Sequence, residues 1–121
     1  MEILAISRYP RISAQKAQEV AREIQGLSAA RALETLQFIP RKGARLLEKT
    51  LRAAVANAHE YNRHHNEKIG VDRLMVKEAR VGRGPQIQRW KAAARGRAAP
   101  RLRRSSHFRI VLTDVPARKA K

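Results

Sequence analysis

The chain contains no cysteine among its 121 residues. Without thiols it can form no disulfide framework, thiolate nucleophile or thiolate metal site. No apolar run approaches the roughly 18–20 residues needed to cross a bilayer. The short apolar run near the start follows the acidic Glu2 and is too brief for a secretory signal. We therefore expect a soluble, intracellular protein with no membrane partner.

Acidic side chains are also scarce, at 10 Asp and Glu against 27 Lys and Arg, which gives a net charge of +17. They are absent between Glu78 and Asp114, a stretch of 35 residues that carries ten basic groups. Residues 1–78 have a net charge of +5, and residues 79–121 a net charge of +12. Such a density of like charge disfavours a compact isolated state. Nine of the ten basic residues are Arg, whose planar fork suits phosphate, so nucleic acid is the leading partner class.

Groupings typical of catalytic or metal sites are missing. No Ser/His/Asp set, phosphate loop or carboxylate pair stands out among so few acids. His59, His64 and His65 fall near the end of a predicted helix, but no Cys partner and no HExxH spacing accompanies them. A cationic or hydrogen-bonding role at a helix C-terminus is the favoured interpretation. We predict that the chain is not an enzyme and holds no metal or other cofactor.

The first 62 residues predict one strand and three helices. Residues 2–9 are rich in β-branched and apolar side chains and end at Pro10, as a short strand does. Ser13 predicts the N-cap of a helix that closes at Gly26, and Ser28 that of a second, which ends before Pro40. A third helix is predicted from about residue 42 to 62. The apolar positions expected to pack are Ala17, Val20, Ala21 and Ile24, then Ala29, Ala32, Leu33 and Leu36, then Leu47, Leu51, Ala54, Val55, Ala58 and Tyr61.

The remaining sequence changes to a strand-like pattern. A polar exit from the third helix and a turn at Gly70 precede predicted strands at 73–81 and 107–113. In the second strand, Phe108, Ile110 and Leu112 are expected to point inward, and Arg109, Val111 and Thr113 outward. The fold class is therefore α+β, a single domain of three helices packed on a small three-stranded antiparallel sheet with a long protruding β-hairpin. The globular part is expected to comprise residues 1–82 and 104–114, and residues 115–121 a flexible basic tail.

The segment between these two strands has two interpretations. It holds some 25 residues, with glycines at 82, 84 and 96 and prolines at 85 and 100. It can be a basic loop that is disordered when free, because structureless loops of this length are usually functional or disordered. It can also be a β-hairpin over 83–103, whose arms of about 12 residues reach roughly 40 Å at ~3.3 Å per residue. The two are compatible if a partner orders the arm.

Basic and aromatic residues of this segment are the candidate nucleic-acid contacts. Gly96, between two Arg residues, lets the backbone approach a ribose-phosphate chain. Trp90, the only tryptophan, either stacks on an unpaired base or packs loosely on the hairpin. Three basic residues surround the start of the first helix, whose positive end adds to them, although a solvated turn is an equal alternative. The candidate contacts are Arg8, Arg11, Lys16, Arg80, Arg83, Arg89, Trp90, Lys91, Arg95, Arg97, Arg101, Arg103, Arg104 and His107.

Three stretches, read in order, resemble the large-subunit ribosomal protein twenty-two family, which lines the peptide exit tunnel. The first is Arg11-Ile-Ser-Ala-Gln-Lys16, which follows a short strand. The second is Ala53-Ala-Val-Ala-Asn-Ala58, within the long helix. The third is Gly84-Pro85, then Arg95-Gly-Arg97, and nine residues on Ser106-His107 before an apolar strand. The resemblance runs from about residue 3 to 114.

This resemblance implies a bacterial-type, divergent member of that family and a non-catalytic role in the cytoplasm, within the large ribosomal subunit. An organellar ribosome is the other possible location. The implied partners are large-subunit ribosomal RNA, neighbouring large-subunit ribosomal proteins and the nascent peptide at the hairpin tip. By resemblance the protein bridges RNA domains during assembly. The residues nearest the tunnel would be Gln86, Ile87, Gln88, Arg89, Trp90 and Lys91.

The sequence departs from the family pattern in its hairpin. Trp90 and Lys91 stand where aliphatic residues are usual, and Ala92 and Ala93 replace a Pro-Arg pair. Phe108 replaces a smaller aliphatic residue. These changes suggest that the tunnel-side contacts differ in this member.

Two other functions are compatible with the basic arm. An architectural DNA-binding protein could lay a β-ribbon arm in a groove, although it would normally need to dimerise to bend duplex. A cationic membrane-active protein is the weaker alternative, because the basic segment is expected to lack an amphipathic face.

Overall fold

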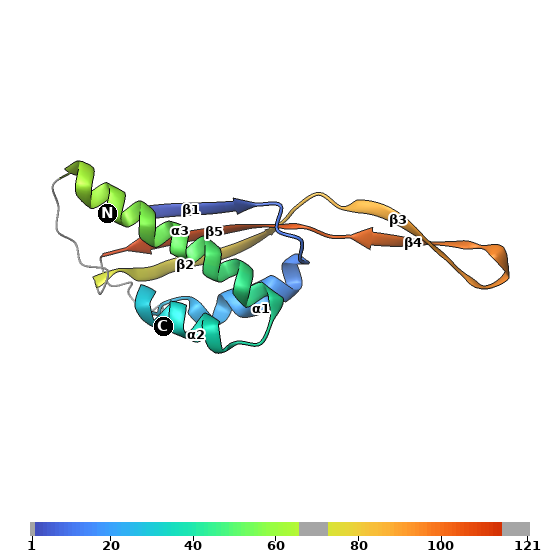
Figure 1. The fold of residues 1–121 in the computed structure, drawn as a ribbon, viewed down its shortest axis with the longest axis horizontal. Coiled ribbons are helices and arrows are strands. Elements are labelled where there is room, and N and C mark those ends of the chain that lie inside the picture. Colours follow the sequence, from blue (N-terminus) through green and yellow to red (C-terminus); the bar gives the residue numbers. More distant parts are fainter. Residues whose placement is uncertain (1, 66–72, 115–121) are drawn as a thin grey trace, which may run out of the picture.

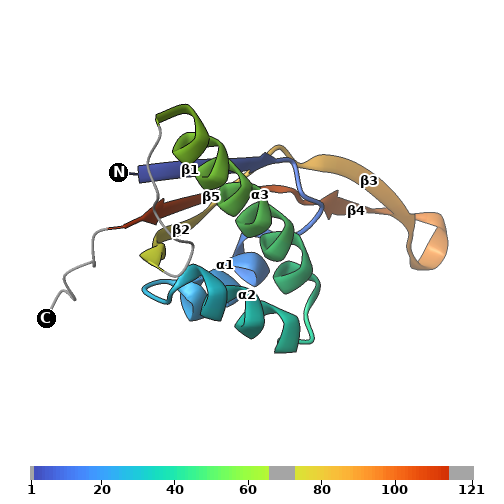
Figure 2. The same ribbon diagram turned by 60° about the vertical axis from the view of Figure 1, so that its left-hand side comes forward.

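The computed structural model describes residues 2–65 and 73–114 (Figure 1). Its elements in chain order are β1 Glu2–Arg8, α1 Ala14–Ile24, α2 Ala29–Phe38, α3 Lys42–His65, β2 Met75–Arg83, β3 Ile87–Ala92, the short 3-10 helix η2 Ala94–Gly96, β4 Ala98–Arg103 and β5 Ser106–Thr113. The three helices and three strands of the body lie together at one end, and β3 and β4 project from it (Figures 1 and 2). No helix in the described ranges is long and apolar enough to cross a membrane.

The sheet of the body has the strand order β1-β5-β2, and both pairings are antiparallel. This confirms the predicted three-stranded sheet. The register places Ala5, Ile110 and Ala79 side by side on the three strands. All three are buried beneath the helices, together with Phe108 and Leu112. Within residues 2–65 and 73–114 no helix lies on the opposite face, since α1, α2 and α3 all pack on the first (Figure 2).

The predicted serine caps begin the first two helices. The side chain of Ser13 accepts a hydrogen bond from the Lys16 amide at 3.4 Å, and that of Ser28 one from the Arg31 amide at 3.3 Å. Gly26 follows α1 with a φ of +83°, a conformation that glycine adopts without strain. All four predicted core residues of α1 are buried. In α2, three of the four predicted positions are buried and Leu33 is half-buried.

Helix α3 extends three residues beyond the predicted end. Its last turn is held by His65, whose ring stacks on Tyr61 at a centroid distance of 4.2 Å. The His65 Nδ1 also lies 3.1 Å from the Tyr61 carbonyl oxygen, so this histidine has the hydrogen-bonding role expected at a helix C-terminus. Leu47, Leu51 and other predicted positions are buried, whereas Val55 and Tyr61 are half-buried. The predicted turn at Gly70 lies outside the described residues.

The central strand β5 corrects one expectation. Val111 and Thr113 lie on the sheet face away from the helices, as the alternation predicts, yet each is only 5% exposed. The reason is that strands border β5 on both sides, so neighbouring side chains such as Glu78, directly opposite Val111, cover this row. Strand β2 also differs, because it runs from 75 to 83 rather than 73 to 81 and contains a bulge between Val76 and Glu78.

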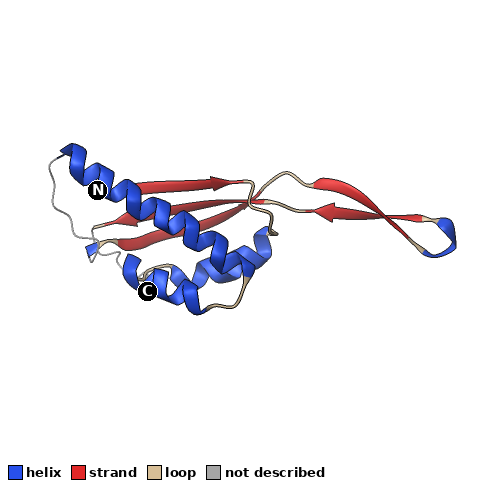
Figure 3. Cartoon of the chain, viewed as in Figure 1, coloured by secondary structure: helices blue, strands red, loops and turns tan. Residues whose placement is uncertain are grey.

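The basic segment takes the hairpin form rather than that of a structureless loop. Strands β3 and β4 pair antiparallel over six residues each, from Ile87 opposite Arg103 to Ala92 opposite Ala98. They form a separate two-stranded ribbon that continues β2 and β5 outward (Figures 1 and 3). Pairing in the body extends to Arg83 opposite Ser106, so only a short stretch separates the ribbon from the sheet. The predicted basic tail at 115–121 lies outside the described residues.

Candidate nucleic-acid interface

The ribbon presents basic side chains mainly on one face. In an antiparallel pair, residues that lie directly opposite each other share a face, and successive residues alternate. Arg89 therefore lies on the same face as its partner Arg101, and Lys91 on the same face as Ala99. Arg103, opposite Ile87, completes this surface. We call Arg89, Lys91, Arg101 and Arg103 the cationic face of the ribbon.

This cationic face repels itself. Arg89 and Arg101 are direct cross-strand neighbours. The Cβ atoms of such a pair are about 5 Å apart, so two positive side chains lie side by side. Opposed like charges destabilise a strand pair, and every residue of β3 is exposed, so no buried core offsets the repulsion. No acidic residue occurs between 79 and 113 to neutralise it. This repulsion favours binding of an anionic partner, such as a phosphate backbone, to the cationic face.

The far end of the ribbon is a tight turn. The amide of Ala93 donates to the carbonyl of Arg97 at 2.6 Å, and η2 lies between them. Arg95 has a φ of 62° and Gly96 a φ of 72°, so two successive residues occupy the left-handed region. Glycine adopts this conformation freely, whereas Arg does so at a cost of roughly 1–2 kcal/mol. The turn thus carries local strain beside two exposed guanidinium groups.

At the base of the ribbon the two chain segments approach very closely. The amide of Gly84 donates to the Ser105 carbonyl at 3.0 Å, and the Ser105 hydroxyl donates to the Pro85 carbonyl at 2.6 Å. A Cβ atom on Gly84 would lie 2.6 Å from the Ser105 Oγ and 3.1 Å from its carbonyl carbon. Only glycine fits at this crossing. These contacts fix where the ribbon leaves the body.

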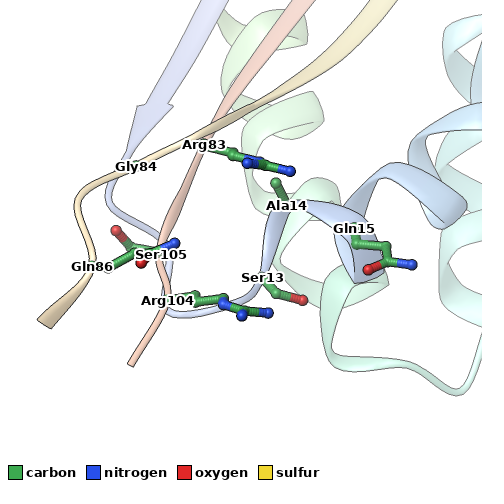
Figure 4. Close-up of a pocket in the computed structure, with 8 residues that line it drawn as sticks. All are labelled: Ser13, Ala14, Gln15, Arg83, Gly84, Gln86, Arg104 and Ser105. Carbon is green, nitrogen blue, oxygen red and sulfur yellow. The ribbon is translucent and has the colours of Figure 1, made fainter. Parts of the chain in front are cut away.

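A pocket of about 150 Å³ lies beside this base. Its walls come from three segments of the chain (Figure 4). The start of α1 contributes one wall, and the side chains of Arg83 and Arg104 extend toward it from the outgoing and returning segments. Helix α1 has no acidic residue in its first turn, so no carboxylate of that turn offsets the positive end of its dipole. This arrangement suits an anion such as a backbone phosphate.

His107 has a structural contact that the sequence did not indicate. The Tyr9 amide donates to the His107 Nδ1 at 3.2 Å, and the two rings meet edge to face with centroids 4.9 Å apart. Tyr9 adopts a φ of 63° to make the turn from β1 toward α1. His107 is half-buried and holds this turn against the base of the ribbon. Its ring is less open to a partner than the surrounding Arg side chains.

The uncovered face of the body's sheet carries a second basic group. Arg80 lies directly opposite Arg109, and both are exposed. The Arg80 Nε lies 2.6 Å from the Glu78 Oε1, so these two charges form an ion pair. Arg109 is therefore the more available positive charge. Farther along this face Lys77 pairs with Glu2, and its hydrogen bond and positive charge lower the pKa of the Glu2 carboxyl. Arg109 was not among the candidate contacts. Its predicted outward position in a strand was the signal that could have identified it as one.

The structure divides the predicted contacts into three groups. The ribbon and its turn hold Arg89, Trp90, Lys91, Arg95, Arg97, Arg101 and Arg103. At the base, Arg83 and Arg104 line the pocket, whereas Arg11 and Lys16 flank the start of α1 without lining it. Arg8 ends β1 opposite His107. Arg80 lies apart from them on the sheet face.

The residues expected nearest the tunnel do not form the turn of the hairpin. Gln86 lies at the base, where it lines the pocket, and Ile87 to Lys91 run along the arm in β3. The outermost residues are Ala94–Gly96 (Figure 3). In the described ranges no group of three or more His, Asp or Glu side chains could hold a metal ion. His64 lies instead 3.5 Å from the Glu60 carboxylate, one turn back along α3.

Comparison with known proteins gives a consistent result. The family model described as ribosomal protein L22p/L17e matches residues 5–113. The large ribosomal subunit protein uL22 of Opitutus terrae is 48% identical over 114 residues, which cover 94% of this chain and 96% of that protein. The protein of the same name from Akkermansia muciniphila is 45% identical over 114 residues, covering 94% and 97%. The match spans both the helical body and the basic ribbon, so the chain belongs to the L22p/L17e family of ribosomal proteins.

Proposed function

We propose that this protein is a structural constituent of the large ribosomal subunit and binds its ribosomal RNA. The observation that carries the proposal is the ribbon, which places Arg directly opposite Arg and has neither a buried core nor an acidic residue. Family membership favours the ribosomal role over DNA architecture and over membrane activity, and it supports the expectation of a non-enzyme in the cytoplasm.

Phosphate neutralisation is the main source of affinity in this proposal. Each Lys or Arg that meets a phosphate releases condensed counterions, so binding weakens steeply as salt rises. The helical body folds around its own core and supplies a rigid base. The ribbon then acts as an RNA-stabilised strut, with the pocket at its base holding one further phosphate between Arg83 and Arg104.

The length and direction of the strut suggest its finer role. The molecule is extended, and basic groups lie along the ribbon, at its base and on the sheet of the body (Figure 1). The protein can therefore contact separate RNA segments and bridge them during assembly. Membership of the family supports a position of the hairpin at the exit tunnel. There Gln86 to Lys91 would line part of the wall, and the turn at Ala94–Gly96 would come closest to the nascent peptide. Neighbouring ribosomal proteins would contact the exposed surfaces of the helical body.

Sedimentation tests this proposal. The tagged chain should co-migrate with the large ribosomal subunit in a sucrose gradient and remain there after washing at moderate salt. A chain that sediments as a free dimer and binds duplex DNA as well as ribosomal RNA would contradict it. A reconstruction of the particle would then locate the ribbon relative to the tunnel.

A further inference from the structure

The ribbon has a second face of different chemistry, so the expectation that the basic segment lacks an amphipathic face is wrong. The residues that alternate with the cationic ones are Gln88, Trp90 and Ala92 on β3, opposite Leu102, Pro100 and Ala98 on β4. Five of these six are apolar, and none is buried. Trp90 is 64% exposed and Leu102 48% exposed. We call Trp90, Pro100 and Leu102 the apolar face.

Nothing in the described part of the chain covers this face. Strands β3 and β4 make their substantial contacts only with each other, and the helices all pack on the sheet of the body. Contiguous exposed apolar surface of this kind marks an interaction site. Trp90 lies directly across from Pro100, so the two side chains form one platform, with Leu102 one pleat nearer the body.

We propose that the apolar face docks unpaired nucleobases of RNA, with one base stacked on the Trp90 indole. The proposal rests on the proposed function and specifies which part of the RNA this face contacts. Charge complementarity selects the occupant, because four cationic side chains lie on the other face of the same two short strands. A nucleic acid whose phosphates bind these side chains has its bases as its only large apolar groups. Bases in a duplex have their faces covered by neighbours, so the bases that fit are unpaired.

The two faces then contribute in different ways. The cationic face neutralises phosphates and gives a salt-dependent affinity. The apolar face removes Trp90 from water without neutralising any charge, so its contribution is largely independent of salt. Loss of one base-stacking aromatic lowers affinity by about 5- to 150-fold.

Because Trp90 is the only tryptophan in the chain, its fluorescence reports on this face alone. The experiment titrates the full-length protein with a 12-nucleotide single-stranded RNA and with a duplex of the same sequence. Anisotropy of a dye on the RNA measures binding separately. At saturation, the single strand is expected to quench Trp90 emission and protect it from acrylamide, whereas the duplex leaves it accessible.

Variants separate the two faces. Trp90→Ala should weaken binding to the single strand by about 5- to 150-fold, leave duplex binding nearly unchanged and leave the salt slope the same. Trp90→Phe should restore most of the loss, because phenylalanine retains an aromatic face. Arg101→Ala, the matched change on the cationic face, should weaken both complexes and lower the salt slope by about 0.7–0.9.

The outcomes distinguish this inference from the proposed function. If neither RNA binds, the RNA-binding function itself is wrong. If both RNAs bind with a steep salt slope while Trp90 remains accessible to acrylamide, the function stands and base docking is wrong. Protection of Trp90 by an apolar peptide but not by RNA would also overturn base docking and assign the face to a polypeptide.

Discussion

Removing the cationic face should reduce the salt dependence of RNA binding by a predictable amount. The variant replaces four exposed residues of the ribbon with Ala, namely Arg89, Lys91, Arg101 and Arg103. If each contacts one phosphate, the slope of log K against log salt concentration should fall by about 3, since each contributes about 0.7–0.9. On doubling the salt concentration, wild-type affinity would then drop about 8-fold more than that of the variant.

The body should remain folded in this variant. Exposed substitutions of this kind change the free energy of unfolding by only about 0.5 kcal/mol. Relief of the repulsion between Arg89 and Arg101 would even act in the stabilising direction. Circular dichroism melting measures stability, and filter binding to a large-subunit ribosomal RNA transcript at five salt concentrations measures the slope.

A control variant with the same net charge tests whether position matters. It replaces four exposed basic residues of the helices, namely Arg22, Arg31, Arg45 and Lys49. Its slope should change by less than one, because these residues lie away from the ribbon. Equal loss of slope in both variants would show that only overall charge matters and would refute the assignment of the RNA-binding surface.

Further predictions concern the joint and the core. Gly84→Ala should displace the ribbon, because the added Cβ has no space beside the backbone of Ser105. Incorporation into subunits should be impaired while the helical content is retained. Normal incorporation in a sucrose gradient would contradict this. Phe108→Ala should lower the free energy of unfolding in urea by about 3–5 kcal/mol, since this ring is fully buried between sheet and helices, and a loss under 1 kcal/mol would refute that packing. Ser106→Ala should be neutral or stabilising by about 1 kcal/mol, because the Ser106 hydroxyl is buried and no described residue is its hydrogen-bond partner. Clear destabilisation would reveal a partner. Glu2→Gln should lower the urea midpoint slightly at neutral pH but not in acid. The reason is that a carboxyl whose pKa is lowered in the fold stabilises it above the ordinary pKa and loses this effect as the pH falls through the lowered pKa. An equal difference at both pH values would count against the ion pair.

Local signals were sufficient to predict the body of the fold. Ser13 and Ser28 cap helices because their hydroxyls accept free amide hydrogens, an interaction confined to four residues. The apolar spacing of α1 identified each of its buried residues. Burial of Val111 could not be read in this way, because it depends on which strand is central, and that is set by pairings between distant parts of the chain.

The site was predictable in composition but not in arrangement. The absence of acids in 79–113 predicted that this segment binds a polyanion, and the segment forms the ribbon. Its turn at Ala94–Gly96 was harder to place, because Arg95 adopts a left-handed conformation that its residue type does not favour. The pocket at the base was not predictable, since the start of α1 meets Arg83 and Arg104 only after the sheet has formed.

The two-residue repeat of the ribbon restricts how its length can change. Deleting one residue from either arm would turn every side chain beyond that point to the opposite side, so Arg101 would come to lie beside the indole of Trp90. Deleting two residues would shorten the arm by one pleat and preserve the separation of charged from apolar groups. Natural variation in this arm should therefore occur in steps of two residues or be confined to the turn, where alternation has already ended.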